Sequence, residues 1–472
     1  MNVRGLVSIL LPGILATASL AAATQEPSDP LARVRERGTL TLSDSFAAAA
    51  ASNERVAQAQ EDLNQARLFR TSARSQVLPQ LTLVDVYYRQ NPVSVNSGGT
   101  GSVVTVSDTR NELRVDLTQP IFHGLRDRNF LLYSAKNIEA SRYAVEETRR
   151  LLYSDVALAF YTVLEHEGQV EALERILKME RERAREIEAW HEEGLARKTE
   201  VLLVKSQLEQ DEANLVRIRN LVSSAKQQLS FWITQPVEWP LQDDLVLPEA
   251  PVPASGSEGE AEILASMQRE ARVSRSDLKQ QEMEVEAAHY QIGFARGEYF
   301  PALDLDASAY LDRTNYSAFA QETDWSASLM FSVPLFEGGR IRSNVLTAKS
   351  KLRQAELARD ELTRKVDLQV KDAFLTLQSD LATLATFQAS VDAAEENSRL
   401  ILEEYRQGLA TNLEVVTGQN QLLSALLNQE HQRNQVRIDW IALKLTQGLI
   451  PEGSPSDLWV SPIPNPSQKD PS

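Results

Sequence analysis

The side chains best suited to acid–base or metal chemistry are five histidines, and their spacing argues against both. No two of them lie four residues apart, as two ligands on one helical face would. Cysteine is absent, so no thiolate is available as a nucleophile or as a further metal ligand. We interpret the run from His191 to Glu193 as a solvated cluster. The histidines are His123, His166, His191, His289 and His431.

Sequence patterns of two common enzyme classes are also missing. No glycine-rich loop ends in Lys-Ser or Lys-Thr, as a phosphate-binding loop does, and no G-x-S-x-G motif marks a nucleophilic serine. We therefore predict that the chain is not an enzyme and holds no cofactor and no metal. Energy for any transport would have to come from a partner protein.

The first 23 residues have the layout of a secretory signal. Arg4 is followed by an apolar run over 6–20 and then by three alanines, 21–23. A transmembrane anchor is the alternative, but the run is shorter than the ~20 apolar residues that span a bilayer. We therefore expect an exported chain that begins near Thr24.

The composition limits the possible partners. The formal net charge is −17, from 66 acidic and 49 basic residues, whereas nucleic acid requires a basic surface. An acidic surface that only aids solubility is the other interpretation. Because cysteine is absent, the chain has no disulfide and no cysteine that could carry a lipid anchor.

An internal duplication is the clearest pattern in the sequence. The segment Pro120 to Arg126 (PIFHGLR) reappears 214 residues later as Pro334 to Arg340 (PLFEGGR). We predict a strand-to-helix turn at each copy, formed by Pro120 with Gly124 and by Pro334 with Gly338. Because the spacing holds without slippage, each copy should be a continuous unit, and the two should pack side by side. Pairs in this register include Val156/Val370, Ala159/Ala373, Phe160/Phe374, Gly194/Gly408 and Glu200/Glu414.

Two regions without proline predict very long helices. No proline lies between Pro120 and Pro236 or between Pro334 and Pro451, and a proline inside a helix costs about 3 kcal/mol. The residues from Arg126 to about 193 therefore predict one helix of roughly 68 residues, about 100 Å long at ~1.5 Å per residue. Such a helix is longer than a globular domain is wide.

A heptad pattern follows Gly194 and predicts coiled-coil packing. We expect Gly194 and Gly408 to form tight turns between antiparallel helices, with Thr199 or Thr411 capping the next helix. Asp211 is the one polar residue in the pattern. The apolar positions are Val201, Val204, Leu208, Leu215, Ile218, Val222, Ala225, Leu229 and Trp232.

Four segments alternate apolar and polar residues and predict strands. Residues 303–311 and 325–333 form one hairpin, and residues 81–89 and 111–119 form another, joined by a polar loop over 90–110. Strands of ~9–11 residues after a secretion signal fit a transmembrane β-barrel, and an ordinary two-faced sheet is the alternative. Four strands cannot close a barrel, so a membrane barrel requires an oligomer. Tyr87, Tyr88, Tyr310 and Trp325 occupy positions where an interfacial aromatic girdle would lie.

These patterns divide the chain into five segments. After the signal, 1–23, the first repeat covers 24–235, with its β-hairpin at 79–120 and its tip near 194. A proline-rich linker follows at 236–258. The second repeat covers 259–450, with its β-hairpin at 301–334 and its tip near 408. The tail, 451–472, is also rich in proline, and we expect linker and tail to be irregular.

The chain resembles the TolC family of outer-membrane efflux and secretion channels. The resemblance rests on LPQL (78–81), FPAL (300–303), PLFEGGR (334–340) and YRQGLAT (405–411) in this duplicated order, and extends from Leu40 to about Pro451. It implies a mainly α-helical α+β fold: a homotrimer with two transmembrane β-hairpins per protomer forming a twelve-stranded barrel, and a long coiled-coil α-barrel in the periplasm. It also implies a periplasmic adaptor (membrane fusion protein) and an inner-membrane pump as partners.

The resemblance also assigns roles at the helix tips. The turns at Gly194, Leu195, Gly408 and Leu409 would dock an adaptor; a turn without a partner is the alternative. Glu414 would narrow the periplasmic aperture. The second acid of that aperture is replaced here by Thr417, which puts a doubled acidic ring in doubt.

The resemblance further suggests a lock that holds the tip closed. Tyr405 and Glu200 stand where a tyrosine reaches an acidic side chain on the neighbouring helix pair, but the arginine after the tip glycine is replaced by Ala410. The alternative is that Tyr405 packs and Glu200 is solvated. Three copies of Glu414 around a pore would raise one another's pKa and attract cations.

The function that these features favour is a passive exit duct in the outer membrane of a Gram-negative bacterium. A secreted coiled-coil structural or adhesive protein and a periplasmic adaptor are the alternatives, but neither needs lipid-facing hairpins. The sequence does not distinguish cargoes. Drug efflux with a resistance-nodulation-division pump is our preference, and type I protein secretion with an ABC pump is second.

Overall fold

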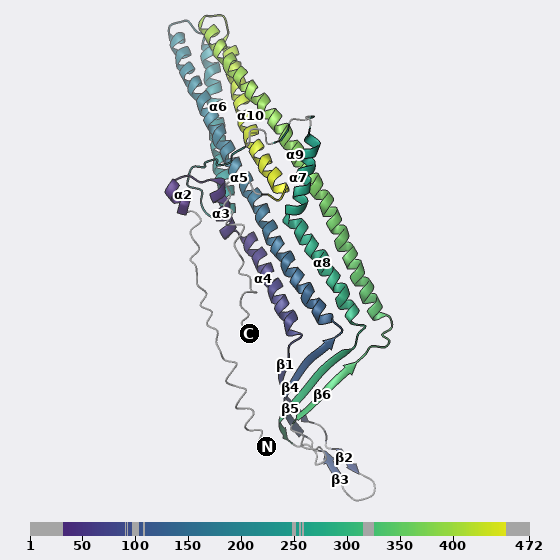
Figure 1. Ribbon diagram of the computed structural model, residues 1–472. Helices are drawn as coiled ribbons and strands as arrows, with labels where there is room; N and C mark the ends of the chain where they lie inside the picture. The colour runs from purple at the N-terminus through teal and green to yellow at the C-terminus, as the bar shows by residue number, and fades with distance from the viewer. Residues whose placement is uncertain are drawn as a thin grey trace.

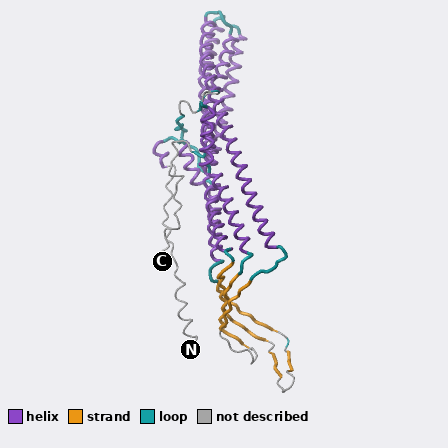
Figure 2. Tube along the Cα trace, turned by 45° about the vertical axis from the view of Figure 1, so that its right-hand side comes forward, coloured by secondary structure: helices purple, strands orange, loops and turns teal. Residues whose placement is uncertain are grey.

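The protein is an elongated rod with three tiers (Figures 1 and 2). A sheet forms one end, the tips of two helical hairpins form the other, and short helices surround the middle. The computed structural model describes residues 32–89, 91, 93–96, 103–106, 109–247, 252–253, 256, 259–314 and 325–449. The expected signal, 1–23, and the tail, 451–472, lie outside the described residues.

Four long helices form the two hairpins. α5 (Arg126–Glu192) and α9 (Arg340–Arg406) each contain 67 residues, and they begin 214 residues apart. α6 (Lys198–Ile233) and α10 (Asn412–Thr446) are the returning helices, with 36 and 35 residues. The prediction of very long helices in the two proline-free regions is therefore confirmed. Among the described residues, no helix contains an apolar stretch that could cross a bilayer.

The helices form a layer with a constant lateral order. Toward the tips, α5 packs between α6 and α10, and α10 packs on α9. Toward the sheet, α4 (Glu54–Ser75) and α8 (Ser276–Gly297) take the places of α6 and α10, giving the order α4, α5, α8, α9. One edge of the layer therefore belongs to the first repeat, and the other edge is α9 throughout.

The sheet continues this order. β1 (Gln80–Arg89), β4 (Thr109–His123), β5 (Ala302–Thr314) and β6 (Trp325–Ser332) pair antiparallel in the order β1-β4-β5-β6. Both predicted hairpins are present, and β4 and β5 join them into one sheet. β1 and β6 are the edges, again one from each repeat.

The loop expected over 90–110 contains two further strands. β2 (Val93–Asn96) and β3 (Val103–Val106) pair antiparallel as a separate ribbon. The prediction of a loop alone was therefore wrong. The many Gly, Ser, Thr and Asn residues of this segment led to the prediction of a loop. The segment also contains two valine-rich runs, and β-branched valine favours strands.

The predicted turn at Pro120 is also corrected. Pro120 lies inside β4, opposite Asp304 of β5, next to an irregularity in the pairing. A proline without an N–H is tolerated in a strand at such a bulge. Its counterpart Pro334 follows the end of β6, as predicted. β4 has a neighbouring strand on each side, whereas β6 has only one among the described residues.

The main core lies at mid-length, where short helices pack on the long ones. α3 (Leu42–Ser52) packs on α5, and α7 (Glu260–Ser274) packs on α9. α2 (Ala32–Arg37) precedes them. The paired residues Phe160 and Phe374 are both fully buried, each in the cluster of its own repeat. Of the linker, residues 236–247 contain no helix or strand, only a bridge between Leu40 and Leu241.

Candidate functional site at the helix tips

The two tips are tight turns that expose one large apolar side chain each. Gly194 and Gly408 have φ angles of +78° and +75°, a conformation that glycine adopts without strain. Leu195 and Leu409 are both 75% exposed. The two turns, which contain the four predicted tip residues, lie at the same end of the rod (Figure 1), and each turn exposes one leucine to a possible partner.

The two returning helices begin differently. Thr411 caps α10: its hydroxyl accepts from the Glu414 N–H, and the Glu414 carboxylate accepts from the Thr411 hydroxyl at 2.8 Å and from its N–H. These bonds lower the pKa of Glu414. Glu414 and Thr417 are exposed three residues apart, so they share one helical face. Thr199, the other expected cap, lies inside α6, whose N-cap Arg197 makes no side-chain cap.

Tyr405 is held by aromatic and cationic contacts with the other hairpin. Its ring lies 5.8 Å from that of Trp190 and 4.9 Å from the Arg183 guanidinium, both on α5. Among the described residues, no hydrogen bond joins Tyr405 to Glu200. Burial raises the pKa of Tyr405, and the nearby Glu200 charge adds to the shift. The predicted lock residues are therefore close, but Tyr405 contacts Arg183 and Trp190 of α5.

Asn412 completes the connection between the hairpins. Arg183 donates through Nη2 to the Asn412 side-chain oxygen and, at 3.5 Å, to its backbone oxygen. Asn412 Nδ2 in turn donates to the backbone oxygen of Glu200 at 3.2 Å. At the surface, Arg406 Nε lies 3.4 Å from Glu186 Oε1. We call Arg183, Trp190, Tyr405 and Asn412 the tip bridge; it joins α5 to the end of α9 and the start of α10.

A pair of buried carboxyl groups lies one turn from Arg183. Glu180 of α5 and Asp211 of α6 are 2% and 3% exposed. Asp211 accepts hydrogen bonds from the side-chain amides of Gln207 and Asn214. Burial and the facing Asp211 raise the pKa of Glu180 to about 8. Glu180 therefore keeps its proton at neutral pH.

Sequence reasoning missed most of this network, although one signal was present. The inward positions of α5 follow alternating steps of three and four residues, and they include the two charged residues Glu180 and Arg183. Charges at such positions mark a site. Trp190 and Asn412 carry no comparable signal. The inward residues are Leu173, Ile176, Glu180, Arg183, Ile187 and Trp190.

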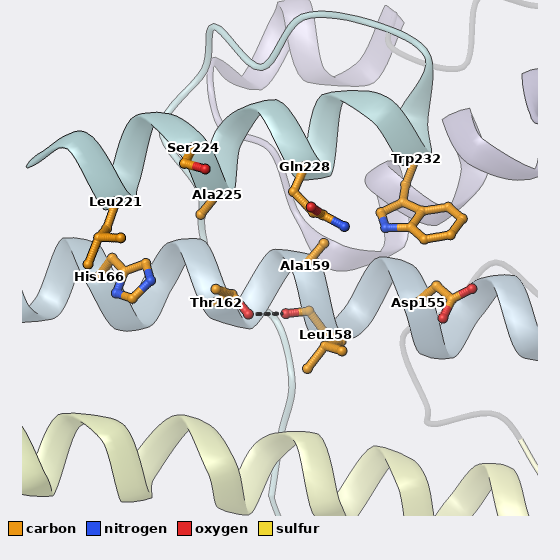
Figure 3. A pocket seen from close by; sticks show the side chains of 10 residues that line it. All are labelled: Asp155, Leu158, Ala159, Thr162, His166, Leu221, Ser224, Ala225, Gln228 and Trp232. Atoms are coloured by element: carbon orange, nitrogen blue, oxygen red, sulfur yellow. Dashed lines mark hydrogen bonds between the residues drawn. The ribbon is translucent and has the colours of Figure 1, made fainter. Parts of the chain in front are cut away.

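A groove of about 470 Å³ lies between α5 and α6 nearer mid-length (Figure 3). Asp155 and His166 lie toward opposite ends of it, and Trp232 stands beside Asp155. The hydroxyl of Thr162 donates to the Leu158 backbone oxygen at 2.7 Å, as helical threonines often do. Because acid and base do not converge, the groove has no catalytic arrangement. In the described part of the chain, no cluster of His, Asp and Glu could hold a metal ion.

The strand-to-helix turns show why glycine is needed in one repeat more than in the other. Gly124 and Gly338 have φ angles of +62° and +60°. A Cβ on Gly124 would lie 2.4 Å from the backbone oxygen of Gly297, whereas one on Gly338 would meet open space. The turn at Gly124 therefore combines a left-handed conformation with close backbone contact.

A family model described as outer membrane efflux protein matches residues 47–233 and 268–449. The chain belongs to this family. The match covers both repeats, and the resemblance to the TolC family is confirmed. The chain is therefore located in the outer membrane of a Gram-negative cell, with its helical part in the periplasm. Members are efflux channels, in agreement with the prediction that the chain is not an enzyme.

Individual relatives are similar at low identity. Outer membrane protein TolC of Escherichia coli (strain K12) is 25% identical over 403 residues, which cover 80% of this chain and 76% of that protein. Nodulation protein T of Rhizobium leguminosarum bv. viciae is 28% identical over 176 residues, 36% of each chain. The crystal structure of the outer membrane protein VceC from Vibrio cholerae has a TM-score of 0.70 at 17% identity. The superposition covers 87% of this chain and 97% of the VceC chain. The two proteins therefore share a fold.

Proposed function

We propose that the protein is the passive exit duct of a tripartite export system and that it works as a homotrimer. The observation that carries this proposal is the constant lateral order of the tiers. The sheet, the long helices next to it and the long helices toward the tips each form one layer of four elements, with an element of the first repeat at one edge and α9 or β6 at the other. Three copies placed edge to edge would give twelve strands and twelve helices around one pore.

The side chains of the edge strands support a barrel in lipid. Leu81 and Leu83 of β1 are 71% and 65% exposed, and Leu329 and Phe331 of β6 are 62% and 66% exposed. In each strand the two residues are two positions apart, so they share one face. Unpaired strand edges are not tolerated in hydrocarbon. Pairing of β6 with β1 of the next copy would remove both edges and turn these apolar faces toward lipid.

Mass and conductance test this proposal together. We expect the full chain, purified in detergent, to have the mass of three copies and to form ion-conducting channels in planar bilayers. A monomer without conductance would rule out the channel and favour a spacer role. A trimer without conductance would keep the oligomer and reject the open duct.

We propose that the tips, Leu195 and Leu409, dock a periplasmic adaptor. Their support is the exposure of one leucine at the end of each hairpin. Photo-crosslinking from these two positions in intact cells should capture an adaptor. An adaptor of a resistance-nodulation-division pump would indicate export of drugs and other small molecules, our preferred cargo. An adaptor of an ABC pump would indicate protein secretion. Cross-links to the lipid or to no protein would reject docking at the tips.

We also propose that Glu414 lines the periplasmic aperture, with Thr417 beside it, and that Tyr405 and Glu200 belong to the contacts that keep this end narrow. The exposure of Glu414 and Thr417 on one face of α10 supports the aperture. Three carboxylates around a pore attract cations. Glu414→Gln should therefore reduce cation selectivity, and unchanged selectivity would remove Glu414 from the aperture.

A further inference from the structure

We propose that Arg183 is the residue that holds the tips of the two hairpins together, by covering the ring of Tyr405 and donating to the side chain of Asn412. This inference rests on the proposed channel function and identifies the contact that would keep its periplasmic end narrow. The first observation is position. Arg183 comes from the core of the first hairpin, but both of these partners belong to the second.

The second observation is burial. Arg183 is 3% exposed, although a guanidinium is strongly hydrated when it is free to reach water. Burial lowers the pKa of Arg183 to about 10, so it still carries its charge at neutral pH. A cation over an aromatic ring is worth most when both are shielded from water. The contact with Tyr405 therefore stabilises the joined tips more than an exposed ion pair would.

The third observation is how Glu200 takes part. Glu200 reaches the network through its backbone oxygen, which accepts from Asn412, and in the described residues its carboxylate makes no hydrogen bond to Tyr405. Arg183 lies over the ring of Tyr405 and also acts on its hydroxyl, so α5 holds Tyr405 through Arg183 and not through the Glu200 carboxylate. Ala410 stands where the resemblance implied an arginine; the cation that contacts Tyr405 in this chain comes from Arg183 of the first hairpin.

The tyrosine offers a sharp test, because its ring and hydroxyl can be removed separately. Tyr405→Phe keeps the ring, and Tyr405→Leu removes it. In bilayers containing the full-length trimer, we expect Tyr405→Leu and Arg183→Gln to raise the open fraction about tenfold, equivalent to about 1.4 kcal/mol. Tyr405→Phe keeps the ring under Arg183 and loses only the hydroxyl, so it should raise the open fraction by less than about threefold. Arg183→Lys keeps the charge without the planar group and should lie between them.

Arg406→Gln is the matched control, since it removes the exposed ion pair with Glu186 at the same level of the rod. We expect a change of less than about twofold, because exposed ion pairs contribute little. This control separates the loss of any charge near the tip from the loss of the buried contact. Tyr405 is only half-buried, so we expect both of its variants to assemble. They test the contact with Arg183 even if Arg183→Gln fails to assemble.

Two results would overturn the role of Arg183. If Tyr405→Phe opened the channel as far as Tyr405→Leu while Arg183→Gln behaved like the parent, the hydroxyl and Glu200 would hold the tip. If all variants assembled and conducted like the parent, the tip bridge would not control opening. A parent protein that forms no channel gives a different outcome, because it rejects the proposed function itself.

Discussion

The two helical hairpins have the same architecture but different interiors. α5 and α9 have equal lengths, and both tips turn through a glycine with positive φ. The buried ionisable residues Glu180, Arg183 and Asp211 of the first hairpin have no ionisable counterparts at the same positions of the second. Residues 214 positions later are Ala394, Asn397 and Ala425. Duplication therefore fixes the backbone, and the differences between the copies decide what each copy does.

A second difference concerns the start of the returning helix. α10 begins with a complete capping box, Thr411 with Glu414, whereas α6 begins without a side-chain cap. The second hairpin thus has the capped returning helix, and it has no ionisable side chain at the three positions that correspond to Glu180, Arg183 and Asp211. The first provides the buried cation that reaches across. We infer that the tip of the second hairpin is the more stable of the two, and that Arg183 of the first hairpin binds to it.

The largest expected effect separates the two strand-to-helix turns. Gly124→Ala adds a strained φ to a clash with the Gly297 backbone, so we expect a loss of about 3 kcal/mol or more. Gly338→Ala meets open space and should cost about 1 kcal/mol. The melting temperatures of the two trimers in detergent measure this. Equal losses would mean that the close contact at Gly297 does not matter.

An aspartate introduced into the second hairpin tests whether its interior tolerates a buried carboxyl group, as the first hairpin does at Asp211. Ala425, the counterpart of Asp211, is 7% exposed and packs in an apolar cluster. Ala425→Asp should destabilise the trimer by about 2 kcal/mol, because it places a carboxylate among the apolar side chains of this cluster. Ser424→Asp, on the exposed face next to it, should change stability by less than about 0.5 kcal/mol. If Ala425→Asp left the stability of the trimer unchanged, water would reach the side chain at position 425.

The carboxyl pair of the first hairpin predicts a pH dependence. The pKa of Glu180 is raised from 4.5 to about 8, so the folded state binds more protons than the unfolded state between these values. Stability should therefore fall as pH rises from about 4.5 to 8, with a slope below about 1.4 kcal/mol per pH unit.

Glu180→Gln should remove its share of this slope in melting curves recorded from pH 5 to 8. Asp439→Asn is the comparison in the second repeat. Burial and the neighbouring Asp380 raise the pKa of Asp439 to about 7, and it should contribute separately. If Glu180→Gln had the same pH profile as the parent, Glu180 would be ionised in the folded protein.

The smallest expected effect concerns the helix caps. Thr411→Ala removes a capping box and should cost about 1 kcal/mol, whereas Thr199→Ala, inside the first turn of α6, should cost less than about 0.5 kcal/mol. Melting temperatures of both variants provide the comparison. If Thr199→Ala lowered the melting temperature more than Thr411→Ala, the tip of the first hairpin would be the more stable of the two.

The sequence was sufficient for the long helices and the four main strands, because proline placement and period-two alternation follow directly from backbone geometry. It was insufficient where tertiary context decides. Pro120 and Pro334 stand in the same motif, but β4 continues through Pro120 because β5 pairs with it. β2 and β3 were missed within a composition typical of loops.

The candidate site was predictable only in part. The tip residues and Tyr405 follow from the duplication and the resemblance. Glu180 and Arg183 could have been found as charges at inward heptad positions of α5. Asn412 could not, because its role depends on how α10 lies against α5. A contact between hairpins that are about 200 residues apart in sequence has no local pattern.

The most direct test of this account is to tie the two hairpins together. The chain has no cysteine, so Glu186→Cys with Arg406→Cys provides the only two thiols per protomer, at a surface site where the original side chains lie 3.4 Å apart. A cleavable bis-maleimide would link them in the Arg183→Gln background. We predict that the linked trimers conduct poorly and that cleavage restores the high conductance. Equal conductance before and after cleavage would contradict the claim that separation of the hairpins opens the channel.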